Sequence, residues 1–307
     1  MASSSTRKAG AWYPRWFWPS FAAPATIWLI ALFVLPFYVI LSVAFGKLDP
    51  IFLSPEPVWS PLQWNSSSSL RVLGELFRNG SIVQSAFLRT LLYVGVATAL
   101  CLLIGYPVAY FIARHSGRFK TFFLVAFIAP FWISYMMRML AWVGLLQDDG
   151  YVNKALVSLH LLGRPTAWLD GRPSTVIMGL VYGYIPYMIL PLYASLDRID
   201  RSVMEAARDL GASPARGFLR VTLPLSRQAI LAGCVIVGLP MFGDYFTQGL
   251  LAASRNTSMI GNIIVSSLQS SLVTEGASLV LILMALLIVP IVYYIRSTNR
   301  AVERGGV

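Results

Sequence analysis

Hydrophobic residues are concentrated in six long runs along this chain, and polar residues fall mainly between them. A helix needs about 20 mostly apolar residues to cross the hydrocarbon core of a bilayer, and each run is about that long. The runs lie roughly at 24–45, 86–113, 120–145, 174–196, 228–250 and 278–296. Only 12% of the residues are charged, whereas a soluble domain carries about 25%. The pattern therefore predicts an all-α integral membrane protein with six transmembrane helices.

Proline interrupts most of these runs. Prolines inside them include Pro36, Pro107, Pro130, Pro186, Pro191 and Pro240. Membrane helices tolerate proline where neighbouring groups satisfy the freed backbone carbonyls, so one interpretation is simple tolerance. The other is that bent helices surround a pathway. The pattern leaves both open.

Basic residues favour one side of the predicted membrane. They exceed acidic residues in the N-terminal tail, the 114–120 turn, the 197–227 loop and the C-terminal tail, whereas the remaining loops are balanced. The positive-inside rule then places both termini and the 197–227 loop in the cytoplasm. The predicted organisation is a cytoplasmic tail over 1–23, a six-span domain over 24–296 with an external loop at 46–85, and a cytoplasmic tail over 297–307.

The remaining chemistry narrows the function classes. The net charge of +11 is explained by topology, and no basic face on a soluble module predicts nucleic-acid binding. Cys101 and Cys234 lie within apolar runs and His115 and His160 are isolated, so neither disulfides nor a metal site are expected. A membrane enzyme would need a nucleophile with its base, or a metal, at membrane depth. No such group is visible, and we expect no catalytic residue.

The 197–227 loop has a helical pattern of its own. Ser202 followed three residues later by Glu205 is a capping-box pattern for a helix start, and Gly211 is a natural helix stop. Ser213-Pro214 then places a capping residue before proline at the first helical position. The pattern predicts two short helices joined at Gly211-Ala212 and held against the membrane face.

The first of these helices has a small apolar face. Met204, Ala207 and Leu210 recur at helical spacing. One interpretation is that Glu205 only caps its own helix while the alanines allow close packing inside the subunit. The other is that a helix of small and charged residues fits the groove of a partner, with the charges fixing the register.

The spacing of this loop resembles the cytoplasmic loop of permease subunits of bacterial ABC importers. The chain reads Glu205-Ala206-Ala207, three residues, Gly211, nine residues, Val221, one residue and Leu223-Pro224. Val221 stands where the family usually has isoleucine. In that family the loop enters a cleft of a separate ATPase subunit and transmits ATP-driven closure to the membrane helices. The resemblance implies that Glu205, Ala206, Ala207, Gly211, Val221, Leu223 and Pro224 couple this chain to an ATPase.

The resemblance also implies a setting and partners. It implies the fold of a type I ABC-importer permease in the bacterial plasma (inner) membrane, working by alternating access. The implied partners are a second homologous permease subunit, two copies of an ABC ATPase, an extracytoplasmic substrate-binding protein and the lipid bilayer. No GxxxxGK[ST] phosphate-binding loop occurs in the chain, so ATP and Mg would bind to the ATPase subunits and no cofactor is expected here. An ion-coupled secondary transporter is the alternative, and the 205–224 motif argues against it.

Three segments resemble permeases of the spermidine/putrescine type: 130–153, 180–200 and 242–264. The implied substrate is a polyamine, although permeases for ferric iron, phosphonates and related solutes share the fold and the loop. A polyamine is a flexible polycation that favours carboxylates and aromatic faces.

Two ionisable residues lie deep within the predicted spans. At about 1.5 Å per residue, Asp244 would lie roughly 24 Å and Arg138 roughly 27 Å above the cytoplasmic edge, so the two could meet near the external mouth. Such groups usually face the bundle interior and often serve function; a structural ion pair or a hydrated interfacial position is the alternative. The predicted pathway residues are Asp244, Tyr245, Trp132, Tyr135, Arg138, Trp142 and Tyr187, although each aromatic residue is also compatible with ordinary packing.

Overall fold

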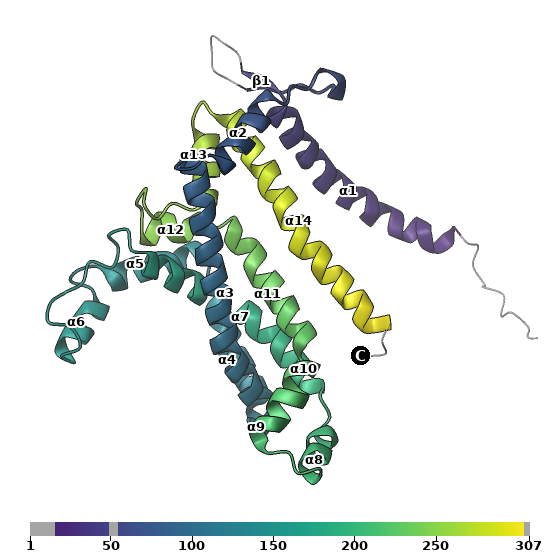
Figure 1. Cartoon of the computed structure of the whole chain (residues 1–307), viewed down its shortest axis with the longest axis vertical. Helices are drawn as coiled ribbons and strands as arrows, with labels where there is room; N and C mark the ends of the chain where they lie inside the picture. The colour runs from purple at the N-terminus through teal and green to yellow at the C-terminus, as the bar shows by residue number, and fades with distance from the viewer. Residues whose placement is uncertain (1–15, 49–54, 304–307) are drawn as a thin grey trace, which may run out of the picture.

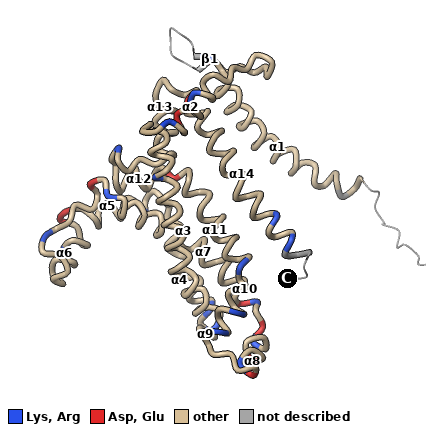
Figure 2. Tube along the Cα trace, viewed as in Figure 1, with Lys and Arg blue, Asp and Glu red and all other residues tan. Residues whose placement is uncertain are grey.

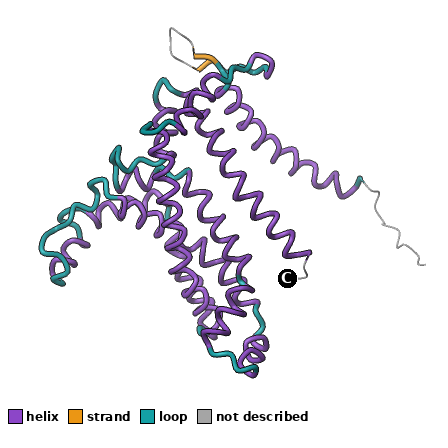
Figure 3. The backbone as a smooth tube through the Cα atoms, in the orientation of Figure 1, coloured by secondary structure: helices purple, strands orange, loops and turns teal. Residues whose placement is uncertain are grey.

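The computed structural model describes residues 16–48 and 55–303, and nearly all of its regular structure is helical (Figures 1 and 3). Four helices are long and apolar enough to cross a membrane: α1 (Phe17–Ala44), α3 (Ile82–Arg114), α7 (Pro173–Arg198) and α14 (Val273–Glu303). Two bent helix pairs raise the number of candidate spans in the described residues to six. The predicted all-α membrane fold is therefore confirmed. Parts of the predicted tails and external loop, at 1–15, 49–54 and 304–307, lie outside the described residues.

Shorter helices connect or extend these spans. They are α2 (Ser67–Phe77), α4 (Lys120–Ile128), α5 (Tyr135–Leu146), α6 (Tyr151–Ser158), α8 (Arg201–Asp209), α9 (Pro214–Gly217), α10 (Leu223–Leu225), α11 (Arg227–Phe242), α12 (Phe246–Leu251) and α13 (Ile260–Gln269). Three 3-10 turns, η1 (Pro61–Gln63), η2 (Gly117–Phe119) and η3 (Ala129–Trp132), and one π-helical turn, η4 (Phe218–Thr222), complete the helical set. The two-residue strands β1 (Lys47–Leu48) and β2 (Pro55–Glu56) pair antiparallel.

The main core lies where α3, α7 and α11 pack together (Figure 1). Small residues on α3 allow this close approach, because Ala97, Cys101 and Ala109 are all fully buried. A β-carbon added to Gly233 of α11 would lie 2.6 Å from the sulfur of Met188. Close packing of small residues is a main source of helix association in membranes, and it makes these three helices the body of the protein.

The third predicted span is not a single helix, which corrects the prediction over 120–145. Residues 117–132 and α5 meet at an angle of 87°. Pro130 lies in η3, and Ile133 has an extended backbone with ψ of 138°. Proline cannot donate an intrahelical hydrogen bond, and an extended residue ends the helical ladder. The chain therefore turns sharply after Trp132, and heights calculated from one straight helix do not hold beyond this point.

The fifth predicted span is also interrupted. α11 ends at Phe242 and α12 begins at Phe246, so Asp244 lies in a break between helices and not inside the continuous helix predicted over 228–250. At its other end, α11 meets residues 214–225 at an angle of 61°. Breaks of this kind are tolerated at membrane depth only where the backbone is buried in protein or lines a water-filled cavity.

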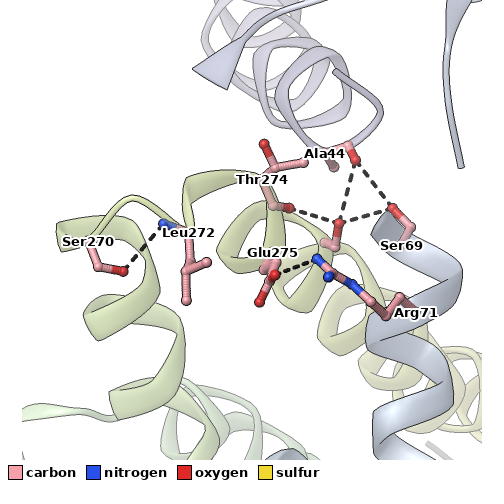
Figure 4. Close-up of polar contacts among 8 residues, drawn as sticks. Ala44, Ser69, Arg71, Ser270, Leu272, Thr274 and Glu275 are labelled. Carbon is pink, nitrogen blue, oxygen red and sulfur yellow. Dashed lines mark hydrogen bonds and ion pairs between the residues drawn. The ribbon is translucent and has the colours of Figure 1, made fainter. Parts of the chain in front are cut away.

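α1 lies apart from the main core; its C-terminal end meets the start of α14, and the two helices diverge from there (Figure 1). Their junction is polar (Figure 4). The hydroxyls of Ser69 and Ser278 lie 3.0 Å apart, and both donate to the carbonyl oxygen of Ala44 over 3.4–3.5 Å. An ion pair between Arg71 and Glu275 links α2 to α14 beside them. These contacts fix the position of α14 relative to α1 and α2.

Candidate functional site

The predicted loop helix α8 begins earlier than its capping-box pattern indicated. Asp200 is the N-cap, and its carboxylate accepts a hydrogen bond of 3.0 Å from the backbone N–H of Ser202. The prediction that Ser202 and Glu205 cap the helix is therefore wrong, because Asp200 is an equally strong capping residue placed two positions before Ser202. The same N–H lowers the pKa of the Asp200 carboxyl.

The predicted connection between the two short helices is confirmed. Gly211 has φ of +80°, a left-handed conformation that glycine adopts without a β-carbon penalty. Ser213 then caps α9, its hydroxyl accepting from the N–H of Arg216 at 3.4 Å, and Pro214 is the first helical residue. The chain reverses here within four residues, which brings α9 and η4 against α8.

One face of α8 is held by the rest of the segment. The sulfur of Met204 accepts a hydrogen bond from the hydroxyl of Thr222 at 3.4 Å, and its methyl group lies 3.3 Å from a β-carbon built on Gly217. Ala207 is half-buried beside it. The predicted apolar face fails at Leu210, which is 89% exposed. The helix ends before Leu210, and this side chain is therefore directed away from Met204.

The other face of α8 is free. Glu205 and Ala206 are exposed, and Glu205 forms none of the ion pairs found in the described part of the chain. Of the remaining predicted coupling residues, Gly211 and Pro224 are exposed, whereas Val221 and Leu223 are half-buried. An exposed leucine beside small and charged side chains is a surface suited to docking in a partner's groove, as the second sequence interpretation proposed.

The segment is joined firmly to the main core. Phe218 of η4 packs edge-on against Tyr106 and Tyr110 of α3, with ring centroids 5.6 and 5.8 Å apart. The buried hydroxyl of Tyr106 lies 2.8 Å from the hydroxyl of Ser226. Met204 thus joins α8 to η4, and Phe218 joins η4 to α3.

A second polar site lies in the α11–α12 break. Asp244 is 6% exposed. Its carboxylate accepts hydrogen bonds from the hydroxyls of Tyr135 at 2.6 Å and Tyr184 at 3.3 Å, and from the hydroxyl and N–H of Thr247 at 2.8 and 2.9 Å. Four donors from three helices thus surround one carboxylate and satisfy its oxygens.

Two glycines make room for this cluster. Gly179 and Gly183 lie on the same face of α7 at a spacing of four residues. A β-carbon on Gly183 would lie 2.5 Å from the Tyr135 ring, and one on Gly179 would lie 2.6 Å from the methyl group of Thr247. The small-xxx-small pattern in α7 therefore allows Tyr135 and Thr247 to reach Asp244.

Arg138 does not form the alternative ion pair with Asp244. Among the described residues its guanidinium has no acidic partner within 4 Å. The guanidinium lies 4.2 Å from the ring centroid of Phe131 and 5.4 Å from that of Tyr135. Its Nε donates a hydrogen bond to the carbonyl of Ile133. The sharp turn before α5 directs Arg138 toward Phe131, which explains why the ion pair with Asp244 is not formed. Arg138 and Asp244 do share Tyr135 as a neighbour, as their predicted proximity required.

The other predicted pathway residues are distributed unevenly. Trp132 is 80% exposed, and Tyr187 and Tyr245 are partly exposed. Trp142 packs edge-on against Tyr182 in a hydrophobic cluster, as the ordinary-packing alternative expected. Sequence reasoning missed Tyr184 and Thr247. The sequence spacing could have indicated both residues. Tyr184 lies one helical turn before Tyr187. Thr247 lies three residues after Asp244, the spacing at which a helix-capping residue meets its partner.

Comparisons with known proteins agree with this arrangement. The family described as "Binding-protein-dependent transport system inner membrane component" matches residues 102–305. The spermidine/putrescine transport system permease protein PotB of Haemophilus influenzae is 33% identical over 294 residues, covering 90% of this chain and 93% of the relative. Its Escherichia coli counterpart is 32% identical over 237 residues, covering 77% and 81%.

Solved structures share the fold. A chain of a bacterial ABC transporter involved in the import of the acidic polysaccharide alginate superposes with a TM-score of 0.68, at 17% identity, over 93% of this chain and 96% of that one. The alginate transporter in complex with its pentasaccharide-bound periplasmic protein gives a TM-score of 0.69 at 16% identity, covering 93% and 94%. The predicted architecture of an importer permease is therefore confirmed.

Proposed function

Since the chain belongs to the binding-protein-dependent transport system inner membrane components, we propose that it is the subunit through which an ATP-driven importer moves polyamines across the inner membrane. The ATPase of such a transporter is a separate subunit, and this chain is the multi-pass permease component. The outer face of α8 carries the proposal, because an exposed face on a segment anchored to the core is what transmission from a separate motor requires.

We place ATPase contact on Glu205, Ala206, Gly211 and the neighbouring Leu210. The small side chains allow close backbone approach, and the charged residues fix register. Val221 and Leu223 support the segment from inside, since they are half-buried. Closure of two ATPase subunits would move α8, and the contact of Phe218 with Tyr106 would carry that movement into α3 and its neighbour α7. Two ATPase copies, a second permease and an extracytoplasmic binding protein complete the proposed assembly.

The polyamine assignment rests on the relatives and on the chemistry around Asp244. PotB of Haemophilus influenzae, named as a spermidine/putrescine permease, is matched over 90% of this chain. A carboxylate framed by tyrosines suits an ammonium group, which gains from both carboxylate oxygens and aromatic faces. Tyr187, 46% exposed, contacts Tyr184 of this cluster, and Tyr245, 37% exposed, directly follows Asp244. In this proposal the cluster binds the cation transiently during alternating access.

The test is uptake by the assembled transporter in proteoliposomes. Radiolabelled spermidine, putrescine, ferric iron and an aminophosphonate are supplied with the binding protein, with and without internal ATP. The expected result is ATP-dependent accumulation of a polyamine. ATP-dependent uptake of another solute alone would refute the substrate assignment and keep the importer. Polyamine uptake driven by an ion gradient without ATP would refute coupling through α8.

A further inference from the structure

A groove with a volume of about 570 Å³ lies between the start of α11 and the last turns of α14. Three arginines line it: Arg227 from α11, and Arg296 and Arg300 from α14. Figure 2 shows basic positions on the last turns of α14 and around α9 and α10, at the end of the molecule that also carries α8. The positive-inside rule assigns that end to the cytoplasmic leaflet, so the groove lies where lipid headgroups meet the protein.

The three arginines form none of the ion pairs found among the described side chains, which do not include that of Glu303. No acidic residue lines the groove. Arg296 and Arg300 are four residues apart on one helix, a spacing at which like charges destabilise each other. Arg227 adds the positive end of the α11 dipole, because it is the first helical residue. The lining of the groove is therefore strongly positive.

An unsatisfied acceptor lies in the same groove. The side-chain nitrogen of Gln228 donates to the backbone carbonyl of Ser297 at 3.2 Å, which holds the amide in place between α11 and α14. The oxygen Oε1 of Gln228 is buried and has no hydrogen-bond partner. A buried acceptor without a donor is costly. Gln228 therefore ties α11 to α14 beside the arginines, and its buried oxygen is not open to a ligand in the groove.

The rest of the lining is apolar. Leu231 and Val292 lie on the membrane side of the arginines, and Tyr293 stands at the mouth with 62% of its surface exposed. Tyrosine is favoured at the level of the lipid headgroups. The groove is thus basic at one end and hydrophobic at the other, which a free phosphate ion would use only in part.

We propose that this groove binds an anionic phospholipid. The phosphate lies against Arg227, Arg296 and Arg300, and the acyl chains follow Leu231 and Val292. Basic pockets between membrane helices on the cytoplasmic side are suited to such headgroups. A bound lipid would hold α14 against α11, a role separate from the transport path around Asp244.

The experiment measures lipid retention by the complete transporter. The complex is purified from nanodiscs containing phosphatidylglycerol, phosphatidic acid and phosphatidylcholine, and retained lipid is counted by native mass spectrometry. Each arginine near an anionic group contributes about fivefold in affinity. We therefore expect R296Q/R300Q to lower the preference for phosphatidylglycerol over phosphatidylcholine by about 25-fold, and R296K/R300K to preserve most of it. Arg118→Gln is the matched control, because Arg118 is an exposed arginine of the predicted cytoplasmic 114–120 turn that does not line the groove.

Several outcomes would overturn the proposal. Equal retention of phosphatidylglycerol and phosphatidylcholine by the unchanged complex would do so, as would an unchanged preference in R296Q/R300Q or an equal loss in Arg118→Gln. Retention of phosphatidic acid no greater than that of phosphatidylcholine would also contradict a site that recognises the phosphate. Displacement of the lipid by millimolar inorganic phosphate would identify free phosphate as the ligand. Absence of lipid from the complex, with retention by the isolated subunit, would show that a partner chain covers the groove.

Discussion

Replacing Gly183 by alanine should disrupt the Asp244 cluster without changing any polar group. The added β-carbon would lie 2.5 Å from one ring carbon of Tyr135 and 2.9 Å from its hydroxyl oxygen. Carbon atoms pack at about 3.5–4.0 Å, so the ring must retreat by about 1 Å or remain under strain. The distance of 2.6 Å between the Tyr135 hydroxyl and Asp244 would then exceed the range of an O–H···O hydrogen bond.

Both responses have a similar cost. Overpacking costs about 1–3 kcal/mol, and leaving a buried polar group without its hydrogen bond costs about 1–3 kcal/mol. We expect Gly183→Ala to lower the free energy of unfolding by about 2 kcal/mol, measured by SDS-induced unfolding of the purified subunit in mixed micelles. Gly95→Ala is the matched control, since Gly95 lies within α3 and its added β-carbon meets no atom within 4 Å. That variant should be neutral or stabilised by up to about 1 kcal/mol, because alanine is favoured over glycine inside a helix.

A double variant separates this explanation from a general effect on α7. In a Tyr135→Ala background the ring is absent, so the added methyl group at position 183 meets no obstacle and should cost little. If Gly183→Ala destabilises equally with and without the Tyr135 ring, the reasoning from their contact is wrong.

Three further predictions concern the two sites. Leu210→Ser should weaken ATPase association about tenfold, the scale of an interface anchor. Subunit stability should not change, because Leu210 is 89% exposed. A pull-down measures the association, and an equal effect from Leu62→Ser, which is 97% exposed outside this segment, would contradict the prediction. Asp244→Asn should reduce polyamine uptake at least tenfold while ATPase binding is retained, and unchanged uptake would exclude Asp244 from the pathway. Asp200→Ala should speed hydrogen exchange at the Ser202 amide. The pKa of Asp200 is lowered in the folded state, so its cap is fully formed at pH values above the ordinary carboxyl range. The cap is lost as the pH falls through the lowered pKa. Protection of the Ser202 amide that survived further acidification would contradict this assignment.

The sequence predicted the spans well and their interruptions poorly. Periodicity and length locate apolar helices, which is why α3, α7 and α14 appear close to their predicted positions. The turn after Trp132 depends on the extended conformation of Ile133 together with the packing of Arg138 on Phe131. No local sequence pattern predicts this combination. The Pro130 signal was present, but proline inside a membrane run predicts equally a kink, a break or simple tolerance.

The candidate sites show the same division. The glycine stop at Gly211 and the cap at Ser213 are local properties, and both were predictable. The neighbours of Asp244 come from three helices, so their meeting depends on tertiary packing. The spacing of Gly179 and Gly183 was visible in the sequence, but the residues that use the space could be identified only once α5 and α12 were placed against α7.

The separation of α1 from the main core also has a consequence for biogenesis. Its junction partners on α14, Thr274–Ser278, are synthesised roughly 230 residues after Ala44, which at about 5–20 residues per second takes on the order of 10–45 s. During that interval α1 must remain in the bilayer without the helix that it contacts, as a segment of 26 residues whose apolar 18-residue window has a mean hydropathy of 2.5 is suited to do. The fold can therefore close only after α14 has been synthesised, and a nascent chain stalled before residue 273 would leave α1 unattached for membrane proteases to recognise.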